Sequence, residues 1–178
     1  AIVWIEKEKK LYGLNASGRS PESLTLEYFK ENNFESIPAY GPLPVSVPGC
    51  VDGWFELHEK FGKIEMSQIL RPTIKYAEDG FPVSELVSYY MKVASNNFQE
   101  YPNFKETYYI NDSHPQKGQI FKNPDLANTL KLIAKNGKKG FYEGKIANTI
   151  ANFMKEQGGF LSYDCLLYTS PSPRDNKA

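Results

Sequence analysis

The 178 residues of the chain are enough for one domain or for part of a larger one. Lysine plus arginine and aspartate plus glutamate both number 21, so the formal net charge is zero and excludes electrostatic attraction to nucleic acid or to an anionic membrane. The hydrophobic fraction of 40% and the aromatic fraction of 14% exclude a disordered chain.

The first predicted element is a β-hairpin. β-Branched and aromatic residues lie on both sides of the charged residues 7–9, which predicts two strands over residues 1–6 and 10–14. A loop of small residues follows. In it, Ser20 directly before Pro21 predicts the N-cap and the first position of a short helix.

The rest of the chain is predicted to be mainly helical. After a proline-rich extended stretch over residues 37–48, apolar residues recur at spacings of three and four, and glycines follow where each periodic run stops. The expected helices cover residues 49–62, 67–78 with an interruption at Pro72, 84–96, 123–137 and 145–158, with an irregular segment over 97–118 and a turn over 140–144. On the first of these helices, the predicted core face consists of Val51, Trp54, Phe55, His58 and Phe61.

The residues by themselves predict no catalytic set. No phosphate-binding loop of complete spacing and no Gly-x-Ser-x-Gly elbow occurs in the sequence. His58 lies on an apolar helix face and His114 in a loop, so both are interpreted as structural residues and not as metal ligands. Adjacent carboxylates such as Glu78 and Asp79 are expected to be solvated charge. Neither a metal nor a cofactor is therefore expected.

The C-terminal residues differ in character from the rest. Residues 165–175 read CLLYTSPSPRD, and these eleven letters resemble one reading frame of a transposase-type sequencing adapter. Residues 165–178 are therefore predicted to be adapter read-through, and residues 1–164 to be the native part. Cys50 would then be the only native cysteine, which is too few for a disulfide framework or a thiolate zinc site, and the cellular compartment stays open.

Several motifs, in order along the chain, resemble the large subunit of γ-glutamyltranspeptidases. They are GRSP, VSVPGCVDGWFELHEKFGK, LRPTIKYAEDGFPVSE, NPDLANTLKLIAKNGKKGFYEGKIA and GGFLSYD, and together they span about residues 3–164. The resemblance implies an α+β fold, the αββα sandwich of N-terminal-nucleophile hydrolases. This chain would be an incomplete, mostly helical large-subunit portion with an N-terminal β-hairpin.

The same resemblance implies an enzyme that cleaves or transfers the γ-glutamyl amide of compounds such as glutathione. In that family the precursor cleaves itself, and the new N-terminal threonine of the small subunit attacks the substrate carbonyl. The threonine lies downstream of the matched region, so no catalytic residue is expected in this chain and the chain alone is predicted to be inactive. The expected partners are a small-molecule γ-glutamyl substrate and the protein's own small subunit, with no nucleic acid and no membrane span.

Arg19 is the one residue to which the resemblance gives a substrate role. Typical members carry Arg-Glu-x-Ala-Pro in this loop, and that arginine binds the substrate α-carboxylate, whereas this chain reads Ser-Gly-Arg-Ser-Pro over residues 17–21. The two interpretations of Arg19 are a bidentate carboxylate clamp and a side chain that bonds loop carbonyls. Because the arginine is displaced, a cephalosporin-acylase-like enzyme acting on another amide stays an alternative, as does a non-catalytic homologue or helical interaction domain.

Overall fold

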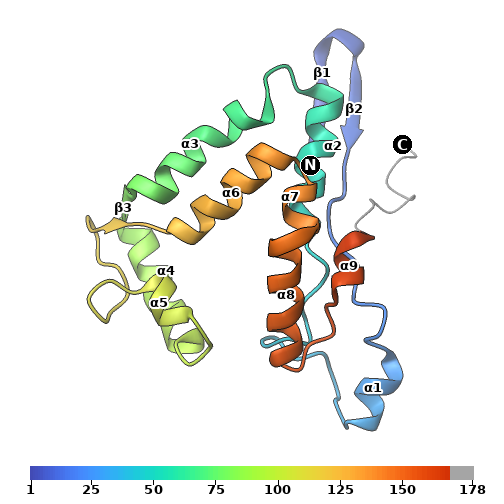
Figure 1. Cartoon of the computed structure of the whole chain (residues 1–178), viewed down its shortest axis with the longest axis vertical. Helices are drawn as coiled ribbons and strands as arrows, with labels where there is room; N and C mark the ends of the chain where they lie inside the picture. Colours follow the sequence, from blue (N-terminus) through green and yellow to red (C-terminus); the bar gives the residue numbers. More distant parts are fainter. Residues whose placement is uncertain (169–178) are drawn as a thin grey trace. The chain divides into compact units, whose positions relative to one another are not determined.

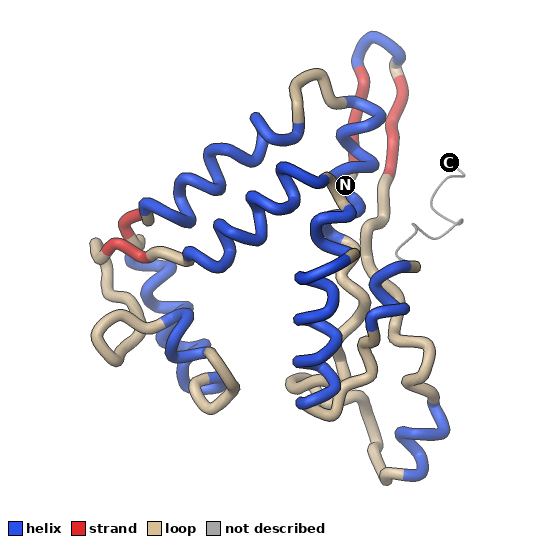
Figure 2. The backbone as a smooth tube through the Cα atoms, in the orientation of Figure 1, coloured by secondary structure: helices blue, strands red, loops and turns tan. Residues whose placement is uncertain are grey.

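The computed structural model describes residues 1–168, which fall into two units. The first unit consists of residues 1–66 and 132–168, and the second of residues 67–131. Helices dominate both units, and within the described residues strands occur only as two short pairs (Figure 2). No helix in residues 1–168 is both long and apolar enough to cross a bilayer.

The first unit combines a β-hairpin with helices of different lengths (Figure 1). Its elements are β1 (Ile2–Ile5), the 3-10 helix η1 (Glu6–Glu8), β2 (Lys10–Gly13), α1 (Leu26–Glu31), α2 (Cys50–Phe61), α7 (Lys139–Tyr142), α8 (Gly144–Glu156) and α9 (Tyr163–Leu167). The predicted hairpin is confirmed, because β1 and β2 are antiparallel with Val3 opposite Tyr12. Lys9 closes the turn in a left-handed conformation with φ of 52°.

Helix α1 begins later than predicted. Thr25 caps it in place of Ser20, since the Thr25 Oγ1 accepts a hydrogen bond from a first-turn backbone N–H at 3.3 Å. Pro21 is buried, and its carbonyl oxygen accepts a hydrogen bond from the Leu24 N–H at 3.1 Å. Ser20 and Pro21 therefore belong to a turn before the helix. The helix ends at Glu31, with Asn32 as its C-cap residue.

Helix α2 confirms the predicted helix between Gly49 and Gly62. Its predicted core face is right at Val51, which is buried, and wrong at Trp54, which is 37% exposed. Asp52 is buried instead, at 4% exposure. The reason is that Tyr142 from α7 and the loop after β2 lie against the side of α2 that carries Asp52.

The C-terminal part of the first unit consists of three consecutive helices. The predicted turn over residues 140–144 is largely the one-turn helix α7, and the predicted helix that follows it is confirmed as α8. Ala147 and Met154 are buried on α8. Gly158, at φ of 73°, adopts the left-handed conformation just after α8 ends, as expected for a C-terminal glycine.

Helix α9 crosses the predicted boundary between native and foreign sequence. Ser162 lies before that boundary and caps the helix, since its Oγ accepts a hydrogen bond from the Cys165 N–H at 3.3 Å. Leu166 lies after the boundary and is buried. Residues 169–178, the remainder of the predicted adapter segment, lie outside the described residues. The foreign origin of residues 165–178 stays a prediction.

The second unit is built from helices and one strand pair. Its elements are α3 (Met66–Asp79), β3 (Phe81–Pro82), α4 (Glu85–Phe98), α5 (Phe104–Tyr108), β4 (Ile120–Phe121) and α6 (Pro124–Asn136), of which Met66 and the last five residues of α6 belong to the first unit. Strands β3 and β4 pair antiparallel. Lys131 on α6 forms an ion pair with Glu78 on α3, and the two helices lie side by side (Figure 1).

The helix starts of the second unit follow the predicted caps. The Ser84 Oγ accepts a hydrogen bond from the Val87 N–H at 3.3 Å, and the Asn123 Oδ1 accepts one from the Leu126 N–H at 2.9 Å. Two details of the prediction are wrong. Pro72 lies inside a continuous α3, and the segment predicted to be irregular contains α5.

Helix α4 exposes apolar side chains along one face. Leu86, Tyr89 and Tyr90 are 63%, 59% and 61% exposed, and their spacings of three and four place them on the same side of the helix. On α6, by contrast, Ala127 and Leu130 are buried. Apolar side chains are thus exposed on one side of α4.

Candidate functional site

The loop after β2 lies directly against the N-terminus of α2. Two glycines permit this approach. A Cβ atom on Gly18 would lie 1.5 Å from the Val47 carbonyl oxygen, and one on Gly49 would lie 2.2 Å from the Ala16 carbonyl oxygen. Neither position therefore accepts a side chain unless the backbone moves. The loop and the entry to α2 thus contact each other backbone to backbone.

Arg19 lies in this loop and is held through its backbone. Its carbonyl oxygen accepts a hydrogen bond from the Val47 N–H at 2.8 Å. The Arg19 side chain is exposed, and within residues 1–168 its guanidinium has no hydrogen-bond or ion-pair partner. Among the described residues, the guanidinium thus bonds no loop carbonyl.

The loop borders a cavity of about 950 Å³ in the first unit. The start of α2 and residues around α9 form the other walls. A cavity of this size lies within the range of about 300–1,000 Å³ that small-molecule sites occupy. Among the lining residues that the structure describes, Arg19 is the only basic one, and Glu22, Asp52 and Asp164 are acidic. Among the described lining residues, a carboxylate can therefore form an ion pair only with Arg19.

Tyr142 connects the buried side of α2 to α7. Its hydroxyl donates a hydrogen bond to the Pro48 carbonyl oxygen at 2.7 Å and accepts one from the Asp52 N–H at 3.1 Å. Tyr142 is 6% exposed, and burial raises its pKa to about 12. The hydroxyl consequently stays protonated at neutral pH and can donate.

Lys138, one turn before Tyr142, makes a second connection to α2. Its Nζ lies 2.8 Å from Oδ1 of the buried Asp52 and 3.8 Å from Oε1 of Glu56. The hydrogen bond to Asp52 raises the pKa of Lys138 above its usual value. The buried carboxylate is thus paired with a cation, which its burial requires.

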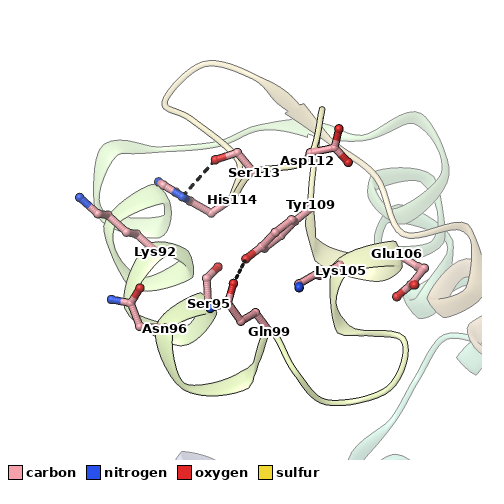
Figure 3. A pocket seen from close by; sticks show the side chains of 10 residues that line it. All are labelled: Lys92, Ser95, Asn96, Gln99, Lys105, Glu106, Tyr109, Asp112, Ser113 and His114. Carbon is pink, nitrogen blue, oxygen red and sulfur yellow. Dashed lines mark hydrogen bonds between the residues drawn. The ribbon is translucent and has the colours of Figure 1, made fainter.

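A second cavity, of about 680 Å³, lies within the second unit between α4, α5 and the turn that follows (Figure 3). The Tyr109 hydroxyl donates a hydrogen bond to Gln99 Oε1 at 3.3 Å across it, and His114 Nδ1 lies 3.5 Å from the Ser113 Oγ. Its charged lining residues are Lys92, Lys105, Glu106 and Asp112. Two cations and two carboxylates balance, so the lining favours no ionic ligand of one sign.

The residues examined as metal or acid–base candidates have structural contacts. His58 Nε2 lies 2.6 Å from the Ile64 carbonyl oxygen, which agrees with a structural role. Glu78 pairs with Lys131. Within residues 1–168, no three His, Cys, Asp or Glu side chains come together as a metal-binding group.

The described threonines include no candidate nucleophile at the Arg19 cavity. Thr129 lies within α6 and Thr149 within α8, and neither lines the cavity. The hydroxyl contacts of Tyr142 with Pro48 and Asp52 join residues that are 94 and 90 positions apart, and no local sequence pattern indicates them. The sequence does not distinguish Asp52 from Glu56 and Glu59, which are acidic residues of the same helix but are not buried.

Known proteins similar to this chain were found by sequence. The profile of the family described as gamma-glutamyltranspeptidase matches residues 1–167. The glutathione hydrolase-like YwrD proenzyme of Bacillus subtilis is 30% identical over 164 residues, which cover 92% of this chain and 31% of that protein. The chain spans about a quarter to a third of the length of the curated relatives it matches.

Solved structures give a similar result. The gamma-glutamyltranspeptidase of Helicobacter pylori matches with a TM-score of 0.90 and 29% identity over 97% of this chain and 50% of that one. The cephalosporin acylase from Bacillus halodurans matches with a TM-score of 0.89 and 34% identity over 96% of this chain and 33% of that one. The observed mixture of helices and few strands agrees with the expected α+β class.

Proposed function

The chain belongs to the γ-glutamyltranspeptidase family, and from this premise we propose that it is a large-subunit portion of an N-terminal-nucleophile hydrolase. The complete protein cleaves or transfers the γ-glutamyl amide of glutathione-like compounds. Its fold is the αββα sandwich, to which this chain contributes the β1–β2 hairpin and much of the helical part. Residues 1–164 are native in this proposal, and residues 165–178 are not.

The nucleophile of the complete protein is a threonine outside this chain. Autocleavage of the precursor exposes its α-amine, which takes the proton of the threonine hydroxyl as the oxygen attacks the γ-carbonyl carbon. The protonated α-amine gives this proton to the departing nitrogen as the amide C–N bond breaks, and the acyl-enzyme then passes its γ-glutamyl group to water or to an acceptor amine. Relatives named as proenzymes support the processing step. Recovery of the downstream reading frame would separate this proposal from a non-catalytic homologue, because only an enzyme encodes the threonine.

Substrate recognition is the task of this chain, and the observation that supports it is the exposed guanidinium of Arg19 at a cavity, which has no hydrogen-bond or ion-pair partner among residues 1–168. A guanidinium offers two parallel donors to a carboxylate, so Arg19 binds the α-carboxylate of the γ-glutamyl group. Loss of a charge-assisted pair of this kind costs about 2–5 kcal/mol when the pair is buried against the substrate.

The test compares two anilides in the complete enzyme. γ-Glutamyl anilide carries the α-carboxylate, and γ-aminobutyryl anilide lacks it but keeps the amino group. Arg19→Ala and Arg19→Lys should raise KM for the first substrate much more than for the second, because only the first has the group that Arg19 binds. Equal losses on both substrates together with a lower Tm would show that Arg19 supports the loop instead.

An acylase acting on another amide is the second candidate, supported by the similarity to the acylase from Bacillus halodurans at 34% identity. Glutaryl anilide separates the two functions, since it keeps the carboxylate of γ-glutamyl anilide and lacks the amino group. A γ-glutamyl enzyme has the higher kcat/KM for γ-glutamyl anilide. A higher kcat/KM for glutaryl anilide would support the acylase and leave the carboxylate-binding role of Arg19 intact.

A further inference from the structure

We propose that Tyr142 is a positioning residue for Arg19, acting through the backbone of residues 47–52. The proposal rests on the carboxylate-binding role of Arg19 proposed above. Tyr142 itself does not touch the substrate, since it is not among the residues that line the Arg19 cavity. Its effect on binding is therefore indirect and depends on the contacts between α7, α2 and the loop.

The first step is the contact between the loop and residue 47. The Arg19 carbonyl oxygen bonds the Val47 N–H, and Gly18 approaches the Val47 carbonyl oxygen so closely that a Cβ would lie 1.5 Å from it. Both polar groups of Val47 thus face the residues that carry the guanidinium. Any displacement of residue 47 is passed to Arg19, because the contact is between backbones and leaves no side chain to adjust.

The second step is the attachment of residues 48–52 to α7. The Tyr142 hydroxyl holds the Pro48 carbonyl oxygen at 2.7 Å and the Asp52 N–H at 3.1 Å, so a single oxygen bridges the residues on either side of the helix start. Without it, the Pro48 carbonyl oxygen loses its hydrogen-bond donor at a partly buried position. The Pro48 peptide unit adjoins Val47, and the bridge consequently fixes the backbone that holds the loop.

The third step is the stiffness of α7 itself. Lys138 pairs with Asp52 at 2.8 Å, so both ends of this one-turn helix are bonded to the first turn of α2. A Cβ on Gly140 would lie 2.5 Å from the Leu132 carbonyl oxygen, which places α7 tightly against the end of α6. The positioning group therefore stands on a support that cannot shift easily, as pre-organised binding requires.

Removal of the Tyr142 hydroxyl should loosen Arg19 without removing it. The expected effect is a rise in KM for carboxylate-bearing substrates of about tenfold, the equivalent of one lost hydrogen bond. The kcat should stay unchanged, because the chemistry takes place at groups outside this chain. Substrates without the α-carboxylate should be insensitive, since they do not use Arg19.

The experiment measures KM and kcat in the complete proenzyme after autocleavage, with γ-glutamyl anilide and γ-aminobutyryl anilide. The variants are Tyr142→Phe, Arg19→Ala, the double variant, and Tyr163→Phe as a matched control. The control also removes a tyrosine hydroxyl that accepts a hydrogen bond from a backbone N–H, that of Gly144 at 3.1 Å, but this hydroxyl makes no hydrogen bond to residues 47–52. Lys138→Met, which removes a half-exposed amine, tests the same support if Tyr142→Phe does not fold.

Support requires that Tyr142→Phe raises KM for γ-glutamyl anilide alone, that it has no further effect in the Arg19→Ala background, and that Tyr163→Phe changes neither KM. An equal rise for both anilides, or a Tyr142→Phe effect that persists in the Arg19→Ala background, would overturn the proposal. If Arg19→Ala raises KM for γ-glutamyl anilide alone and Tyr142→Phe raises KM for both anilides, only the positioning role of Tyr142 is refuted. If Arg19→Ala raises KM equally for both anilides, the carboxylate-binding role of Arg19 and the positioning role of Tyr142 are both refuted.

Discussion

Replacement of Gly18 by alanine should destabilise the loop that carries Arg19. The added Cβ would lie 1.5 Å from the Val47 carbonyl oxygen, and the two backbones must separate by about 1.5 Å for that contact to reach 3.0 Å. The Arg19 carbonyl oxygen and the Val47 N–H are now 2.8 Å apart, so a movement of this size breaks their hydrogen bond.

The cost follows from the groups that lose partners. A lost backbone hydrogen bond costs about 1 kcal/mol, and polar groups left partly buried without partners add about 1–3 kcal/mol. We therefore expect Gly18→Ala to lower the free energy of unfolding by about 2–4 kcal/mol, which is in the range of large single-site effects.

Urea unfolding of the chain, followed by circular dichroism, measures this change. Gly13→Ala is the matched control, because no atom lies within 4 Å of the position of its Cβ and its φ is not in the left-handed region. That substitution should change the free energy of unfolding by less than about 1 kcal/mol. Equal urea midpoints for the two variants would show that the close approach at Gly18 relaxes without cost, and the reasoning would fail.

Three further predictions concern pH, activity and the C-terminus. Burial raises the pKa of Tyr142 to about 12 and the hydrogen bond to Asp52 raises that of Lys138, so both stabilise the fold fully below their unfolded values near pH 10 and lose this effect as the pH rises. The free energy of unfolding measured with urea should be constant up to about pH 9 and fall toward pH 12. The contribution of Tyr142 to this fall should be about 2–3 kcal/mol, and Tyr142→Phe should abolish that contribution. The purified chain alone should not turn over γ-glutamyl anilide and should be poorly soluble because of the exposed face of α4; measurable turnover would contradict the downstream position of the nucleophile. Independent reads of the source DNA should enter adapter sequence at codon 165, and ordinary genomic sequence across that junction would make the tail native.

Most helix boundaries could be predicted because their signals are local. Ser84 and Asn123 cap the helices that follow them through contacts within one turn, and Gly80 ends α3 with φ of 88°. The predicted start of α1 was wrong because serine and threonine are both favourable N-cap residues, and both Ser20 and Thr25 were available. Their choice depends on the burial of the intervening turn, which the local sequence does not encode.

Two details of the second unit, the presence of α5 and the continuity of α3, differ from the prediction for other reasons. The five-residue α5 is too short to show a helical period. Its N-cap residue, Asn103, adopts a left-handed conformation and its side chain makes no capping hydrogen bond. Pro72 was expected to interrupt α3. A proline inside a helix removes one hydrogen bond, and the remaining apolar packing of a 14-residue helix can outweigh that loss.

In the candidate site, too, features set by local sequence could be predicted, whereas contacts between distant residues could not. The loop with Arg19 could be located from its motif, but its support by Tyr142 could not, since the hydroxyl bonds Pro48 across 94 residues. Aromatic residues in a Gly-Phe-Tyr-Glu-Gly turn predict packing, and packing alone would be satisfied by phenylalanine. The hydroxyl is the part that carries the contact.

The structure also gives a physical reason for two short motifs that are separate in the sequence. Gly18 of the Gly-Arg-Ser-Pro motif and Gly49 of the Val-Pro-Gly motif each admit the carbonyl oxygen of the other segment, at a distance that no side chain tolerates. The two motifs therefore form a single backbone contact, and neither glycine can be replaced without moving the other segment. Tyr142 is hydrogen-bonded to one side of this contact, and Arg19 extends from the other side. A substitution at any of these positions should therefore weaken the binding of carboxylate-bearing substrates.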